Sequence, residues 1–138
     1  MINWRGESIM AKKILVIDDD QSILSIFEYI LQEAGYQTET ASDGYEALEK
    51  VKQHADIDLV FTDVKMPGLS GIDTFKEIQK IRPRMLVVMM TGYSVDELLK
   101  EAFELGAYGV IYKPFDMEEV LSIIEKIFNL PQTATAMA

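Results

Sequence analysis

Five short apolar segments, each followed by a stretch with helical periodicity, recur along the chain. The segments 14–17, 58–61 and 85–90 are the clearest strand candidates, because they are apolar apart from Asp58 and too short for buried helices. Continuous apolar runs are typical of strands that have helices packed on both faces of their sheet. Gln37–Ala41 is more polar and fits an edge strand, and Val110–Tyr112 completes the set.

Helical patterns fill the intervals between these strands. Between residues 23 and 34 the apolar side chains repeat at helical spacing, and Gly35 can end that helix. Ser94 and Asp116 are candidate N-caps, because a glutamate follows each of them three residues later. Four more helices are predicted, over residues 44–51, 72–81, 98–105 and 120–128.

The regular alternation of strand and helix predicts βαβ units, which cross over with a right hand and build a parallel sheet. Five such units make an α/β fold, a three-layer (βα)5 sandwich of the flavodoxin-like kind. We expect a five-stranded parallel sheet with the strand order 2-1-3-4-5. The alternation alone does not determine that order.

Composition excludes several classes of function. The chain has 138 residues, no cysteine and one histidine, His54, which excludes disulfide scaffolds, thiolate metal sites and cysteine nucleophiles. Its net charge of −10 argues against direct binding of nucleic acid or of an anionic membrane surface. No apolar run is long enough to span a membrane, and residues 1–10 lack the apolar centre of a signal peptide. We therefore expect one cytoplasmic domain over residues 12–129, with an N-terminal extension at 1–11 and a flexible tail or linker stub at 130–138.

Polar side chains follow four of the predicted strands. Asp18-Asp19-Asp20 follows the first strand, Asp63 the third, Thr91 the fourth and Lys113 the fifth. Because the carboxyl ends of parallel strands share one edge, these groups are expected to converge. With the order 2-1-3-4-5, the point where the strand order reverses lies between the first and third strands. Asp18 and Asp19 should therefore lie beside Asp63.

Three carboxylates in one crevice repel one another unless a cation is present. Without histidine or cysteine nearby, the ligands are hard oxygen atoms, which suit Mg²⁺ and also Mn²⁺. Lys113 supplies a positive charge and Thr91 a hydroxyl group, both of which suit phosphoryl oxygens. An aspartate can also act as a nucleophile toward phosphorus and form an aspartyl phosphate.

Four motifs in this order closely resemble the receiver domain of two-component response regulators. The resemblance covers about residues 12–128. The motifs are Val16–Asp20, Thr62–Gly68 with Gly71, Met90–Gly92 and Tyr112–Phe115.

The resemblance implies a role for each site residue. Asp63 would accept a phosphoryl group from a phosphohistidine on a sensor histidine kinase or on a histidine phosphotransfer protein. Asp19, Asp63 and the main-chain carbonyl of Lys65 would bind Mg²⁺ directly, and Asp18 would act through water. Lys113 would pair with the acyl phosphate.

The resemblance also implies a switch. Thr91 would move toward the phosphate and change the face formed by the fourth helix, the fifth strand and the fifth helix. That face would meet a downstream protein, an effector domain or a second copy in a homodimer. Val110 stands where the family usually has an aromatic residue, so the common coupling between that aromatic residue and Thr91 is not expected here. Lys65 and Tyr93 occupy positions that tune the phosphate lifetime, and we expect slow autodephosphorylation. The Lys113–Pro114 bond is expected to be cis.

The chain would then be a regulatory phosphoprotein rather than an enzyme with an external product. The main alternative is a phosphohydrolase of the haloacid-dehalogenase type, which also uses an aspartate, Mg²⁺, a threonine and a lysine. That class needs a second acid two residues after its nucleophile, and Lys65 occupies that position. A flavodoxin-like FMN binder is a third option, but three aspartates after the first strand would repel its phosphate.

Overall fold

The computed structural model describes residues 12–92 and 96–129, in which five strands alternate with five helices. The predicted extension at 1–11 and the predicted tail at 130–138 lie outside the described residues. Among the residues described, no helix has both the length and the apolar composition needed to cross a membrane. The elements are β1 (Lys13–Ile17), α1 (Gln21–Glu33), β2 (Gln37–Ala41), α2 (Gly44–Gln53), β3 (Ile57–Asp63), α3 (Gly71–Ile81), β4 (Leu86–Thr91), α4 (Asp96–Glu104), β5 (Gly109–Tyr112) and α5 (Met117–Asn129).

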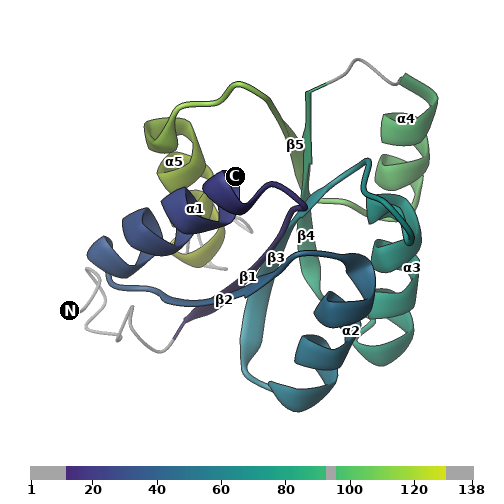
Figure 1. Ribbon diagram of the computed structural model, residues 1–138, viewed down its shortest axis with the longest axis horizontal. Helices are drawn as coiled ribbons and strands as arrows, with labels where there is room; N and C mark the ends of the chain where they lie inside the picture. Colours follow the sequence, from purple (N-terminus) through teal and green to yellow (C-terminus); the bar gives the residue numbers. More distant parts are fainter. Residues whose placement is uncertain (1–11, 93–95, 130–138) are drawn as a thin grey trace, which may run out of the picture.

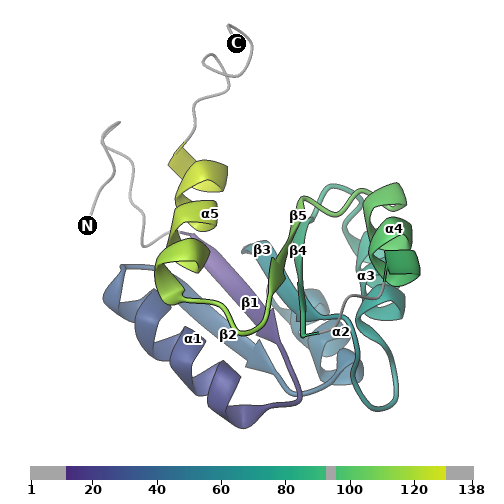
Figure 2. The ribbon, with the colours of Figure 1, turned by 90° about the horizontal axis from the view of Figure 1, so that it is seen from above.

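The strands form one parallel sheet with the order β2-β1-β3-β4-β5, which confirms the predicted fold and strand order. The polar strand β2 lies at an edge, as its composition indicated. Helices α1 and α5 cover one face of the sheet, and α2, α3 and α4 cover the other (Figures 1 and 2). The fold is therefore the expected three-layer sandwich.

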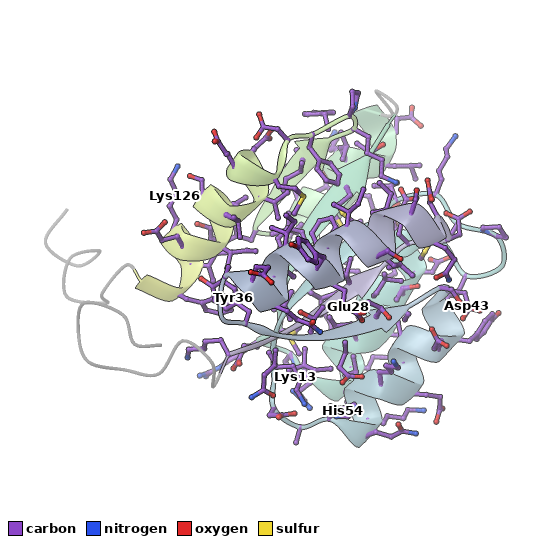
Figure 3. All side chains as sticks on the ribbon, turned by 60° about the vertical axis from the view of Figure 1, so that its left-hand side comes forward. Lys13, Glu28, Tyr36, Asp43, His54 and Lys126 are labelled. Atoms are coloured by element: carbon purple, nitrogen blue, oxygen red, sulfur yellow. The ribbon has the colours of Figure 1, made fainter. Side chains whose placement is uncertain are left out.

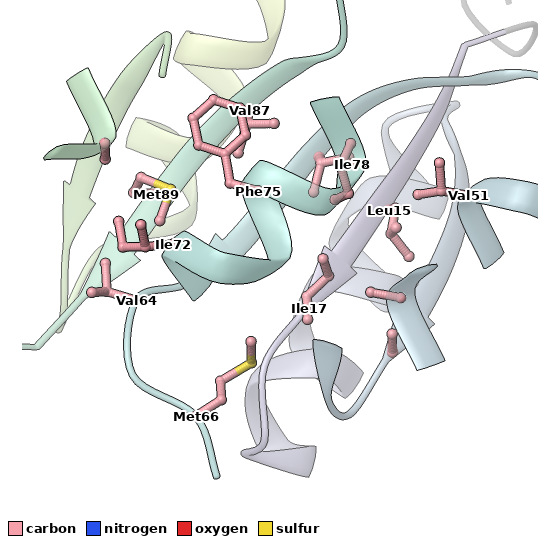
Figure 4. Packing of buried hydrophobic residues seen from close by; sticks show 14 of the residues in the cluster. Leu15, Ile17, Val51, Val64, Met66, Ile72, Phe75, Ile78, Val87 and Met89 are labelled. Atoms are coloured by element: carbon pink, nitrogen blue, oxygen red, sulfur yellow. The ribbon is translucent and has the colours of Figure 1, made fainter. Parts of the chain in front are cut away.

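The two faces of the sheet carry separate hydrophobic clusters, because successive side chains of a strand point to opposite faces. In β1, Ile14 and Val16 point toward α1 and α5, whereas Leu15 and Ile17 point toward α2 and α3. All four are fully buried, which explains why the strand is apolar throughout. Figure 4 shows the second cluster, with Ile72, Phe75 and Ile78 of α3 packed over the sheet.

Short polar side chains cap the starts of α1, α2, α3 and α5. Asp43 Oδ1 accepts a hydrogen bond from Glu46 N at 2.8 Å at the start of α2, and His54 is the C-cap of that helix (Figure 3). Asp116 Oδ1 accepts from Glu119 N at 2.9 Å, which confirms the predicted cap of α5. Gly35 ends α1 with a φ of 95°, as expected for its position. The predicted cap Ser94 lies outside the described residues.

Candidate functional site

Three carboxylates meet where β1 and β3 end. Asp18 and Asp19 directly follow β1, and Asp63 is the last residue of β3. Ile17 lies opposite Thr62 in the sheet, so the residues that follow them are also neighbours. One carboxylate oxygen from each of the three aspartates lies within 4.8 Å of the others. The prediction that Asp18 and Asp19 lie beside Asp63 is confirmed.

Lys113 reaches this group from the end of β5. Its Nζ lies 2.7 Å from Asp18 Oδ2 and 3.3 Å from Asp63 Oδ2. Burial of Lys113 acts to lower the pKa of its ammonium group, but the hydrogen bond to Asp18 and the negative charge of Asp63 raise that pKa overall. Lys113 therefore carries a positive charge at neutral pH.

One lysine does not balance three carboxylates. Burial raises the pKa of Asp63, and the negative charge of Asp18 raises it further, against the opposing effect of Lys113. Asp18 is fully buried and Asp63 is 9% exposed, whereas Asp19 is exposed to solvent. A bound cation would relieve this repulsion, and the oxygen donors present fit a divalent metal ion.

Asp20 has a different function from its two neighbours. Its Oδ1 accepts hydrogen bonds from Ser22 N at 2.9 Å and from Ser22 Oγ at 2.6 Å, so Asp20 is the N-cap of α1. The hydrogen bond from the Ser22 hydroxyl lowers the pKa of Asp20. Asp20 N also donates to Asp18 Oδ1 at 2.9 Å, which orients the buried carboxylate of Asp18.

A cavity of about 580 Å³ opens over the carboxylates. Thr91 is buried at the end of β4, and its carbonyl oxygen accepts a hydrogen bond from Lys113 N at 2.7 Å. Tyr93, for which the resemblance to receiver domains implies a role in tuning the phosphate lifetime, lies outside the described residues. The residues that line the cavity are Asp18, Asp19, Asp20, Asp63, Lys65, Gly92 and Lys113.

Val110 is an internal residue of β5 and lies opposite Met89. Its side chain is partly buried and packs against the cluster under α2, α3 and α4. Tyr108 precedes the strand and Tyr112 lies opposite Thr91, and both tyrosines are about half exposed. Neither tyrosine therefore takes the place of the aromatic residue that the family usually has at position 110. The Lys113–Pro114 bond is cis, as expected.

Thr62 has no individual role predicted from the sequence. This residue is fully buried, and its hydroxyl group donates to the main-chain carbonyl of Asp63 at 3.1 Å. The sequence feature that could have identified Thr62 is its position directly after the apolar residues 59–61. A hydroxyl group there is expected to be buried, and a buried hydroxyl group needs a hydrogen-bond partner.

The geometry of the site suits the acceptance of a phosphoryl group. Asp63 offers a carboxylate at the floor of an open cavity, Lys113 offers a positive charge beside it, and the acidic group offers ligands for a divalent ion. Phosphoryl transfer depends mainly on such positioning and on charge neutralisation.

Comparison with known families gives a match to the response regulator receiver domain over residues 14–125. This range contains all ten strands and helices at least in part, together with the acidic group and Lys113.

Individual relatives agree with this match. The sporulation initiation phosphotransferase F of Bacillus subtilis is 35% identical over 122 residues, which cover 88% of this chain and 98% of the relative. The transcriptional regulatory protein ZraR of Escherichia coli is 40% identical over 113 residues, and the match covers 82% of this chain but only 25% of that protein. The response regulator TrrA of Thermotoga maritima, solved in complex with Mg²⁺-BeF, is 33% identical with a TM-score of 0.76 and coverage of 85% and 99%.

Proposed function

The chain belongs to the response regulator receiver domain family, and we propose that Asp63 is the residue on which it accepts a phosphoryl group. A receiver domain is a phosphoacceptor of two-component signalling and not a classical enzyme. The observation that carries the proposal is the position of the Asp63 carboxylate, 3.3 Å from Lys113 Nζ and within the acidic group. The haloacid-dehalogenase alternative lacks its second acid, because that position is Lys65.

The donor is a phosphohistidine of a sensor histidine kinase or of a histidine phosphotransfer protein. A carboxylate oxygen of Asp63 forms a bond to phosphorus while the phosphorus–nitrogen bond of the donor breaks. The electron pair of that bond stays on the imidazole nitrogen, which takes up a proton, and Asp63 becomes an acyl phosphate. Lys113 lies where its positive charge can pair with the new phosphoryl oxygens.

The proposed metal ion is Mg²⁺, which Mn²⁺ can replace. Asp19, Asp63 and the main-chain carbonyl of Lys65 are its proposed direct ligands, and Asp18 acts through a water molecule. The carboxylate oxygens within 4.8 Å of one another support this set. The Mg²⁺-BeF complex of the Thermotoga relative supports the choice of metal. When bound, the ion neutralises negative charge on the phosphoryl oxygens and on the carboxylates.

Thr91 is proposed to bind the phosphoryl group together with Lys113 and to carry the change toward α4, β5 and α5. Three aromatic side chains on α4, on β5 and on the loop between them are about half exposed, which supports a partner surface there: Phe103, Tyr108 and Tyr112. The partner is a downstream protein, an effector domain or a second copy of this chain. Because Val110 cannot replace the usual aromatic residue, the switch would use backbone movement between β4 and α4. The proposed setting is the cytoplasm, without direct contact to nucleic acid or to a membrane.

Lys65 and Tyr93 are proposed to slow hydrolysis of the acyl phosphate by hindering an attacking water molecule. Lys65 is exposed and lines the cavity beside Asp63, which supports its part of this role. A Tyr93→Ala variant should lose phosphate faster than the wild type does. An unchanged rate of phosphate loss would contradict the role of Tyr93.

One experiment tests the central proposal. The protein is incubated with Mg²⁺ and phosphoramidate, and the modified residue is located by mass spectrometry after borohydride trapping. We expect modification at Asp63, none in an Asp63→Asn variant and none when Mg²⁺ is chelated. An Asp43→Asn variant serves as the control, because Asp43 caps α2 outside the acidic group. Modification at another residue, or none in the wild type, would overturn the assignment of Asp63.

A further inference from the structure

The main chain around Asp63 is held on several sides. The N–H of Val64 donates to the carbonyl of Met90 at 3.0 Å, and the carbonyl of Val64 accepts from the N–H of Gly71 at 2.8 Å. Gly71, the first residue of α3, lies so close that a Cβ atom there would be 1.8 Å from the carbonyl oxygen of Asp63. The start of α3 therefore packs directly on the peptide group that follows the proposed acceptor.

Thr62 contacts the same carbonyl oxygen from within β3. Its Oγ1 lies 3.1 Å from the carbonyl oxygen of Asp63 and donates to it. This hydrogen bond closes a short ring that includes the backbone of Asp63, so it restrains rotation about the residue that carries the carboxylate. The bond acts on the main chain and makes no contact with the cavity in which phosphoryl transfer would occur.

The neighbours of Thr62 in the sheet are apolar and do not account for a hydroxyl group at this position. Thr62 lies between Ile17 of β1 and Met89 of β4 in the sheet, and both neighbours belong to the hydrophobic cluster under α2, α3 and α4. Valine has nearly the same shape as threonine and would suit such a position better, because burying a hydroxyl group is costly. The stability of the fold alone does not explain the hydroxyl group.

We propose that Thr62 is a positioning residue, whose hydroxyl group holds the backbone of Asp63 so that its carboxylate faces Asp18 and Lys113. The same restraint holds the start of the segment that leads to the carbonyl of Lys65, a proposed metal ligand. This inference rests on the proposed function of Asp63. Thr62 thereby affects metal binding and phosphorylation without contacting either the metal or the phosphoryl group.

The test compares two independent pairs of proteins, and the members of each pair differ at the hydroxyl group of residue 62. Thr62→Val and the wild type differ by the hydroxyl group in place of a methyl group, and Thr62→Ala and Thr62→Ser differ by the hydroxyl group alone. The Ala and Ser pair stays informative if the Val variant folds poorly, because both members lack the same methyl group. Thr74→Val is the matched control, since Thr74 is also fully buried and its Oγ1 donates to the carbonyl of Ser70 at 2.8 Å and not to the carbonyl of Asp63.

Two readouts are measured, the Mg²⁺ affinity by isothermal titration calorimetry and the rate of phosphorylation by phosphoramidate. We expect the hydroxyl-free member of each pair to bind Mg²⁺ about fivefold more weakly than its partner and to be phosphorylated more slowly, as for one lost hydrogen bond. The Ser variant should stay close to the wild type in both readouts. Thr74→Val should change the midpoint of thermal unfolding but neither readout.

Three results would overturn the role of Thr62 while leaving that of Asp63 intact. They are equal Mg²⁺ affinities within both pairs, a Ser variant as weak as the Ala variant, and a Thr74→Val variant as weak as Thr62→Val. Failure of the proposed function gives a different result, because the wild-type protein would then carry no phosphate on Asp63 in the mass-spectrometry experiment.

Discussion

Lys13, the first residue of β1, and Asp18, which directly follows that strand, differ in how well the charges around them are balanced. At the amino end, Lys13 Nζ lies 3.1 Å from Asp56 Oδ2, and the hydrogen bond from this lysine lowers the pKa of Asp56. At the carboxyl end, Asp18 shares Lys113 with Asp63, and burial raises the pKa of Asp63. At the amino end of β1 the positive charge of Lys13 is paired with a negative charge. At the carboxyl end negative charge is in excess.

Arg82 extends the matched arrangement at the amino end of the sheet. Its guanidinium group donates to the carbonyl oxygens of Val51 at 3.2 Å, His54 at 2.8 Å and Ile57 at 3.3 Å. These bonds join the end of α2 to the start of β3. Two of them reach the carbonyl groups of Val51 and His54 at the end of α2, where a helix leaves carbonyl groups without partners inside the helix. The amino end therefore contributes stability, whereas the excess negative charge that forms the site at the carboxyl end reduces it.

The largest expected effect is at the amino end. An Arg82→Ala variant should lower the free energy of unfolding by about 3 kcal/mol, because three carbonyl groups lose a charged hydrogen-bond donor. Urea unfolding measures this change. Arg84→Ala is the control, because Arg84 is exposed two residues along the chain. If Arg82→Ala lowered the free energy of unfolding no more than Arg84→Ala does, the amino end would not be a source of stability.

At the carboxyl end, Mg²⁺ should stabilise the protein. At a Mg²⁺ concentration ten times the Kd, binding to the folded state alone raises the free energy of unfolding by about 1.4 kcal/mol. Asp19→Asn should lose most of this gain, and Asp43→Asn should keep it. The measurement is thermal unfolding with MgCl₂, compared with NaCl at the same ionic strength. An equal rise with NaCl would show charge screening instead of a metal site.

Asp63→Asn should stabilise the protein when divalent ions are chelated, by an amount on the order of 1 kcal/mol at neutral pH, because it removes a negative charge beside Asp18. The folded-state pKa of Asp63 is raised, so its ionisation destabilises the fold as the pH rises from the unfolded value, about 3.9, through the folded value. The advantage of the variant should therefore vanish at acidic pH. Unfolding measured in EDTA at several pH values checks this. A variant less stable than the wild type at pH 7 would contradict it.

Asp56→Asn should give the smallest effect, with the opposite sign. The folded-state pKa of Asp56 is lowered, so its contribution is present above the unfolded value and is lost as the pH falls through the folded value. The variant should be slightly less stable than the wild type at pH 7 and equal to it in acid. Because Asp56 is exposed, 1 M NaCl should remove the difference. A difference that survives high salt would indicate a role other than pairing with Lys13.

Much of the fold could be predicted because it depends on local patterns. The apolar runs such as Ile14–Ile17 identify strands buried on both faces, and Asp116 with Glu119 identifies a helix start. The convergence of Asp18, Asp19, Asp63 and Lys113 also followed, because parallel strands share one carboxyl edge. The same patterns did not separate Asp20 from its two neighbours, since an aspartate after a strand suits both a helix cap and a metal site.

The sequence by itself determines the succession of strands and helices along the chain, because spacing and residue type carry this information. It also determines the acidic character of the carboxyl edge and the resemblance to a receiver domain. The sequence does not determine the hydrogen bonds of Arg82 and Thr62 or the contact of Gly71 with Asp63. They join main-chain carbonyl groups to residues whose partners depend on how the layers pack. A carbonyl group is the same at every position of a sequence, so only the packed structure decides which one meets a guanidinium group, a hydroxyl group or a glycine.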